Sequence, residues 1–112
     1  MANTHKWSGG SDRRYEFEIY PFDYDPPEDL EGVYIFAKKV DGVWNAVYIG
    51  QGKIKDRLEE HREDGCVSDK GSTHVHTREV ADKQERLDTE GDLLEGNQEA
   101  YAPTGCNEKK GG

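Results

Sequence analysis

The chain has 112 residues, of which 32% are hydrophobic and 35% are charged, and its formal net charge is −9. No apolar run approaches the roughly 20 residues of a membrane span, and the polar N-terminus lacks the apolar stretch of a secretory signal. We therefore expect a single-domain cytoplasmic protein with no membrane partner. The negative charge is concentrated in residues 1–31 (net −5) and 81–112 (net −4), whereas residues 32–80 are neutral overall. An acidic chain binds phosphate backbones weakly, but the neutral middle leaves room for a local basic site.

Hydrophobic periodicity predicts an α+β fold in which a small antiparallel sheet of three to four strands is flanked by helices. Alternating residues predict the strands 14–20 and 73–80, and the largely apolar segments on either side of the Asp41-Gly42 turn signal predict two more, 32–38 and 44–49. Amphipathic spacing predicts a helix over 54–63 and a second one that Asp82 caps and Gly96 ends. The remaining segments are expected to be irregular: a polar, mobile stretch over 1–12, a loop over 23–29, a loop over 64–72 and the C-terminal tail.

The Asp41-Gly42 pair predicts a hairpin between the second and third strands, and the length of its turn decides which way two tyrosines face. A two-residue turn would pair Tyr34 with Ile49 and place Tyr34 and Tyr48 on opposite faces of the sheet. A three-residue loop that includes Val40 would pair Tyr34 with Tyr48 on one face. The sequence does not choose between these registers, and ordinary strand packing is the alternative role for either tyrosine.

Both predicted helices carry polar residues on the face that their spacing assigns to the core. In the first helix this face holds Ile54, Arg57, Leu58 and His61. In the second helix the same spacing selects Leu87, Glu90, Gly91 and Leu94. Charged side chains are seldom buried alone, so Arg57 and Glu90 either form an ion pair at the edge of the core or belong to a shared site. Arg57 alone has the further option of extending outward. Two such positions on separate elements favour the shared site.

The two cysteines, Cys66 and Cys106, are too few for a disulfide framework. Reduced thiols are the simpler interpretation. The alternative is a tetrahedral zinc set, in which both cysteines act together with His74 and His76. This set lacks the closely spaced cysteine pairs of a zinc finger.

Two short signatures occur on neighbouring strands of the predicted hairpin, namely Gly32-Val33-Tyr34 and Tyr48-Ile49-Gly50. Together with Arg57 and His61 on the following helix, and Glu90 on the next, they resemble the GIY-YIG nuclease superfamily. The resemblance is strongest to its small stand-alone members. The second signature matches outright, and the first has valine in place of isoleucine.

The resemblance extends from residue 32 to residue 107, because Pro103 and Asn107 are similar to the family's terminal proline and asparagine. It implies a GIY-YIG-like nuclease domain over 32–107. Residues 1–31 are then an N-terminal extension with one possible strand, and residues 108–112 are a disordered tail.

The resemblance implies a metal-dependent endonuclease that hydrolyses DNA phosphodiester bonds with one Mg²⁺ or Mn²⁺ ion, held by Glu90. Arg57 would bind the phosphate, and Tyr48 would orient the water or the phosphate. Tyr34 would act as general base once its pKa were lowered from near 10, and His61 would share in proton transfer. The candidates for nucleic-acid binding are Lys53, Lys55 and Asn107, of which Asn107 would also anchor the tail against the site.

A second hypothesis is a catalytically weak binding module with the same fold, which docks on a partner protein or on a nucleic acid complex. The acidic ends of the chain favour docking on a basic partner protein, or on a partner that supplies the affinity for DNA.

Overall fold

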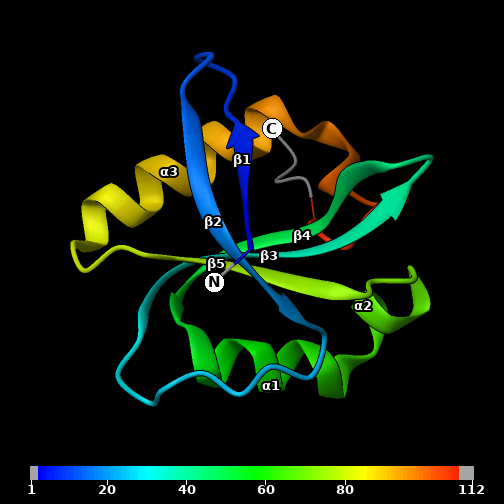
Figure 1. Ribbon diagram of the computed structural model, residues 1–112, viewed down its shortest axis with the longest axis horizontal. Coiled ribbons are helices and arrows are strands. Elements are labelled where there is room, and N and C mark those ends of the chain that lie inside the picture. The colour runs from blue at the N-terminus through cyan, green and yellow to red at the C-terminus, as the bar shows by residue number, and fades with distance from the viewer. Residues whose placement is uncertain (1–2, 109–112) are drawn as a thin grey trace.

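The computed structural model describes residues 3–108 and consists of one antiparallel sheet of five strands with helices on both faces (Figure 1). Across the sheet the strands follow the order β1-β2-β5-β3-β4. They span Thr4–Ser8 (β1), Arg14–Pro21 (β2), Glu31–Val40 (β3), Val43–Lys53 (β4) and His74–Glu79 (β5). The helices span Ile54–Asp64 (α1), Cys66–Asp69 (α2) and Lys83–Gly96 (α3), and a 3₁₀ turn follows at Gln98–Ala100 (η1). The predicted α+β fold class is confirmed. Of the tail expected over 108–112, only Glu108 lies among the described residues.

The sheet separates two hydrophobic layers, and α1 and α3 lie on opposite sides of it (Figure 1). The layer beneath α3 includes Trp7, Phe17, Val33, Ile35, Ile49 and Leu93. The layer beneath α1 and α2 includes Tyr34, Phe36, Val47, Ile54, Leu58 and Val67. Successive residues of β3 alternate between the two layers, as the pleat of a strand requires. Within residues 3–108, no helix is both long enough and apolar enough to cross a membrane.

The sheet has five strands rather than three to four, because the N-terminal segment that was expected to be polar and mobile forms β1. Trp7 on β1 is 3% exposed and lies opposite Tyr15 of β2. Its indole N–H donates a hydrogen bond of 2.9 Å to Nδ1 of His76 on β5. The burial of this large aromatic ring stabilises β1, although the polar and glycine residues around it favour an irregular segment.

The hairpin between β3 and β4 has a two-residue turn, which is one of the two alternatives, but its register differs from both of them. Asp41 and Gly42 have positive φ angles of 52° and 81°, which are those of a type I′ turn. A β-bulge farther along the hairpin adds one residue to β4, so that Tyr34 pairs with Gly50, two residues beyond Tyr48. Both tyrosines therefore face the α1 side of the sheet.

The caps of the two long helices follow the sequence closely. Asp82 accepts a hydrogen bond of 2.8 Å from the backbone N–H of Glu85, which confirms the predicted N-cap of α3. Gly65 adopts a left-handed conformation (φ 88°) and ends α1. The expected loop that follows contains the short helix α2.

Helix α3 presents a different face to the sheet from the one predicted. Leu87, which was expected in the core, is 40% exposed. The buried positions of this helix are Arg86, Thr89 and Leu93. The guanidinium of Arg86 donates hydrogen bonds to the carbonyls of Val80 and Ala81 and to the side-chain oxygen of Gln51. Because a buried guanidinium needs such acceptors, these bonds fix which side of α3 faces the sheet.

The two cysteines are joined in a disulfide, so the expectation of reduced thiols is wrong. The fold brings the Cα atoms of Cys66 and Cys106 to 6.1 Å, which is within the usual range for a disulfide. The zinc set is not formed either, because His74 and His76 face the α3 side while Cys106 packs on the α1 side. Among residues 3–108, no group of three or more His, Cys, Asp or Glu is arranged to hold a metal ion.

His76 is expected to make the stability of the protein sensitive to acid. Burial, with the charges of His5 and His74, lowers the pKa of His76 from 6.5 to about 3. The unfolded chain therefore binds more protons than the folded chain between these pH values, and the free energy of unfolding falls as the pH drops below 6.5. We expect His76 to contribute a loss of about 2 kcal/mol between pH 6.5 and pH 5.

Urea denaturation at the two pH values measures this loss. His76→Gln removes the titrating ring and is expected to flatten the pH dependence. His74→Gln on the same strand is the matched control: it keeps the buried His76, and because burial is the largest cause of the shift in its pKa, most of the pH dependence is expected to remain. Equal pH dependence in wild type and His76→Gln would show that other groups carry the effect.

Candidate active site

A cleft of 930 Å³ lies along the outer edge of β4, between α1 and α3. Its lining includes Tyr48 of β4, Glu60, His61 and Asp64 of α1, Glu90 of α3, and Asn107 and Glu108 of the C-terminal segment. The cleft therefore contains Tyr48, His61 and Glu90, three of the residues that the sequence singled out. They come from three different elements, and only the register of the hairpin and the packing of the two helices bring them together.

Tyr34 joins this group from beneath the cleft. Its hydroxyl oxygen and Nε2 of His61 are 2.9 Å apart, and its side chain is 1% exposed. The ring of His61 also packs on Tyr48, with ring centroids 4.1 Å apart. The rings of the two tyrosines lie 6.1 Å apart at an angle of 20°. The hairpin and α1 thus hold two phenols and one imidazole in a single contact cluster.

Gly50 makes this close packing possible. A Cβ atom on Gly50 would collide with the hydroxyl group of Tyr34 and would lie 2.9 Å from Cε1 of Tyr48. Any larger residue would push the tyrosine rings away from His61. The packing of the two tyrosine rings therefore requires glycine at the last position of Tyr48-Ile49-Gly50.

The electrostatics of the cluster differ from what the sequence analysis required of a tyrosine base. Burial, followed by the charge of Tyr48, raises the pKa of Tyr34, and Arg57 opposes this shift. Burial and then the charge of Glu90 raise the pKa of Tyr48. Burial lowers the pKa of His61. At neutral pH the two phenols are therefore protonated and the imidazole is neutral, so His61, rather than either tyrosine, is the group of this cluster that can accept a proton.

Arg57 lies on the solvent side of α1, beside the cluster. Its side chain is 51% exposed, so it extends outward rather than into the core. The guanidinium contacts the carboxylate of Glu60, one turn further along the helix, at 3.2 Å. Its charge acts on Tyr34, Tyr48 and His61. Arg57 does not itself line the cleft, whereas its partner Glu60 does.

Asn107 holds the C-terminal segment against the edge of the sheet. Its side-chain oxygen accepts a hydrogen bond of 2.8 Å from the backbone N–H of Ile49, and its amide donates one of 3.0 Å to the Ile49 carbonyl. The next residue back, Cys106, donates from its backbone to Val47. Asn107 thus anchors the tail, as expected, and its amide is occupied by backbone groups rather than exposed to a ligand.

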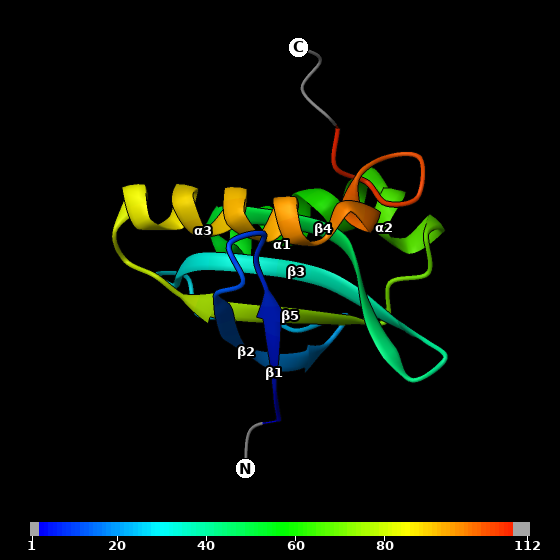
Figure 2. The same ribbon diagram turned by 90° about the horizontal axis from the view of Figure 1, so that it is seen from above.

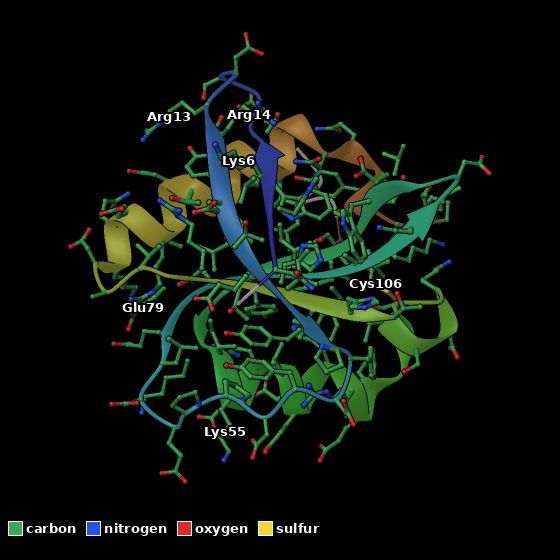
Figure 3. All side chains as sticks on the ribbon, in the orientation of Figure 1. Lys6, Arg13, Arg14, Lys55, Glu79 and Cys106 are labelled. Atoms are coloured by element: carbon green, nitrogen blue, oxygen red, sulfur yellow. A yellow bond between two sulfur atoms is a disulfide. The ribbon has the colours of Figure 1, made fainter. Side chains whose placement is uncertain are left out.

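The two lysines that the sequence analysis added to the site are not brought to the cleft. Lys53 is exposed at the end of β4. Lys55 pairs with Asp25 at 3.4 Å, on the side of α1 that faces the loop before β3 (Figure 3). Neither residue lines the cleft.

Three carboxylates of the cleft were missed from the sequence, namely Glu60, Asp64 and Glu108. Glu60 and Asp64 share a helix face with Arg57 and His61, so helical spacing carries the signal for both of them. Glu108 reaches the cleft because of the path of the C-terminal tail, and no periodic pattern in the sequence predicts that path. These carboxylates and Glu90 line the same cleft, but within residues 3–108 they do not form a group of three or more that is arranged around one ion. Mg²⁺ and Mn²⁺ need only one or two carboxylates beside water and phosphate, so Glu90 alone fits the role of the protein ligand.

Comparisons of the chain with protein-family models, with curated proteins and with solved structures found no match. The residues of the cleft and their chemistry are therefore the evidence from which function is inferred.

Proposed function

We propose that the chain is a metal-dependent endonuclease of the GIY-YIG type, which hydrolyses DNA phosphodiester bonds in the cleft beside β4. The observation that carries this proposal is the convergence of Tyr34, Tyr48, His61 and Glu90, from four elements, on one cleft. The resemblance of the hairpin to the two signatures of that superfamily supports the same reaction.

Hydrolysis of a phosphodiester needs an acceptor for the proton of the attacking water and positive charge on the phosphate. His61 is neutral at pH 7 and would accept that proton at Nδ1, in the tautomer whose Nε2–H donates to the hydroxyl oxygen of Tyr34 and so holds the imidazole ring in place. Arg57 binds a phosphate oxygen and Tyr48 orients the water or the phosphate. Glu90 would hold one Mg²⁺ or Mn²⁺ ion, which when bound supplies Lewis acidity to the phosphate oxygens.

The direct test is cleavage of supercoiled plasmid DNA. We expect the wild-type protein to nick it with Mg²⁺ or Mn²⁺, and not with a chelator. Arg57→Ala is expected to lower the rate about 10²-fold, because the phosphate loses its guanidinium. The matched control is Arg13→Ala, which removes an exposed arginine at the far end of the β1–β2 hairpin (Figure 3). A wild-type protein that cuts neither single-stranded, double-stranded nor branched DNA with either ion would contradict the proposal.

Glu60→Gln is expected to tighten the binding of DNA, because Glu60 competes with phosphate for the guanidinium of Arg57. An exposed ion pair of this kind is weak, so the gain is at most about fivefold. Fluorescence anisotropy of a labelled oligonucleotide in metal-free buffer measures the affinity. Glu59→Gln makes the same change of charge at the neighbouring exposed position and is the matched control. If both variants gained equally, the effect would be one of net charge, and competition at Arg57 would be excluded.

The four carboxylates of the cleft favour a second candidate function, a catalytically weak module that docks on a basic partner protein. This candidate predicts that a lysine-rich peptide binds the wild-type protein and that Asp64→Asn weakens the binding, with no cleavage of DNA. The nuclease proposal predicts cleavage whether or not such a peptide binds.

A further inference from the structure

A second cavity, of 480 Å³, lies on the α3 side of the sheet, between the start of β1 and the β3–β4 hairpin. Its lining includes Asn3, Ile19, Lys39, Trp44, Thr73 and His74. None of the residues that line this cavity lines the cleft beside β4. Its volume is in the range of small-molecule sites, and the proposed nuclease reaction does not use it.

The charge of this second cavity is opposite to that of the cleft. Its described lining contains no carboxylate, whereas four carboxylates line the cleft. The ammonium group of Lys39 lies 5.0 Å from the ring centroid of Trp44, and the ring of His74 packs on Trp44 at 5.1 Å. In a chain with a net charge of −9, a cavity with a cation and without an acid is suited to an anion.

An aromatic ring of strand β1 also lies beside Trp44. The ring of His5 lies 6.5 Å from that of Trp44. Burial lowers the pKa of His5, and the charges of Arg14 and Lys39 lower it further. His5 is therefore neutral at pH 7, and Lys39 is the cation among the described residues that line the cavity. The polar Thr73 hydroxyl, 2.8 Å from Nδ1 of His74, adds a neutral hydrogen-bonding group.

The wall behind Trp44 holds an unusual polar group. His76 is fully buried and its ring lies 4.6 Å from that of Trp44. Its Nδ1 accepts the indole N–H of Trp7, whereas its Nε2 has no hydrogen-bond partner among the described residues. A buried polar atom without a partner is rare and often marks a functional position. It lies here against the same tryptophan that lines the cavity.

We propose that this cavity binds a nucleotide, with its base against Trp44 and its phosphate between Lys39 and His74. Stacking on an aromatic ring holds any base, because every base presents a π face. Lys39 lies over the indole, and a phosphate gives its ammonium group an anionic partner while exposing the ring to the base. The proposal is independent of the nuclease reaction.

The experiment uses 2′-deoxyadenosine 5′-monophosphate as the probe, titrated into ¹⁵N-labelled protein. The indole N–H signal of Trp44 is expected to shift and saturate, while the backbone N–H signal of Gly65, at the end of α1 on the opposite side of the sheet, serves as the internal reference. Deoxyadenosine and inorganic phosphate, each alone, are expected to bind at least about tenfold more weakly. If inorganic phosphate alone bound with equal affinity, the proposed contact between the base and Trp44 would be wrong. If the nucleotide caused no saturable shift, the whole site would be overturned.

Two variants locate the binding. Lys39→Glu is expected to weaken the nucleotide at least about tenfold, because a charge-assisted hydrogen bond is replaced by repulsion. Lys83→Glu reverses the same charge at the exposed start of α3 and is expected to bind as the wild type does. An equal loss in both variants would overturn the site. Glu90→Gln is expected to keep the affinity for the nucleotide, so failure of the nuclease proposal and failure of this one are distinguishable.

Discussion

Replacing Glu90 by glutamine is expected to lower the rate of metal-dependent DNA cleavage at least about 10³-fold, because the amide no longer offers the negative charge that holds a divalent ion. Glutamine has nearly the shape of glutamate, and Glu90 lies at the border of the buried face of α3, so the fold is expected to stay intact. Plasmid nicking over a range of Mn²⁺ concentrations measures the rate and shows whether excess ion restores it.

The control for this experiment is Glu95→Gln, an exposed glutamate on the same helix, which is expected to cleave at the wild-type rate. Circular dichroism melts of both variants report on folding. A Glu90→Gln protein that cuts DNA as fast as the wild type would remove Glu90 from the proposed chemistry. In that case Glu60, Asp64 or Glu108 would have to bind the metal ion in place of Glu90.

Removal of the disulfide is expected to lower the free energy of unfolding by about 3–4 kcal/mol. The bond joins Cys66 to Cys106 across 40 residues of chain, and a cross-link over a loop of this length restricts the unfolded chain strongly. The double variant Cys66→Ser, Cys106→Ser removes it without leaving a reactive thiol. Urea denaturation with and without a reducing agent measures the difference.

The wild-type protein is its own control in this case, because a reductant should shift its midpoint toward that of the double variant and leave the variant unchanged. The fold of the reduced protein is expected to persist in native buffer. The amide of Asn107 still holds Ile49, and Lys70 on the far side of α2 still donates to the carbonyl of Pro103. Equal midpoints for wild type and double variant would show that the bond does not stabilise the fold. The C-terminal segment lies next to α2 in Figure 2, where the cross-link joins the two.

The elements of the fold were largely readable from the sequence, because each has a local signal. Alternation marks β2 and β5, apolar runs on either side of a turn signal mark β3 and β4, and Asp82 and Gly65 mark helix ends. Strand β1 was missed because its signal is one tryptophan among polar residues. The exposure of Leu87 was missed because hydrogen bonds of Arg86 decide which side of α3 faces the sheet. The acceptors of these bonds lie outside α3, so the spacing of residues within the helix does not reveal them.

The sequence predicts those parts of the candidate site that depend on helical periodicity. It does not predict the parts that depend on the path of the chain between elements. The spacing on α1 selects His61, and the packing of Leu58 keeps that face inward. The pairing of Cys66 with Cys106 has no local signal, since the two residues meet only after the tail has crossed β4. The direction of the Tyr34 pKa shift depends on burial, which is a property of the finished core.

The β-bulge in the hairpin has a consequence for how the length of this region can vary. In a regular hairpin with a two-residue turn, an even number of residues between Tyr34 and Tyr48 would direct both rings to the same side, and the odd number present here would separate them. The bulge absorbs the surplus residue and restores the parity. A deletion of one residue between the two tyrosines is therefore compatible with the same cluster, provided that the bulge disappears with it.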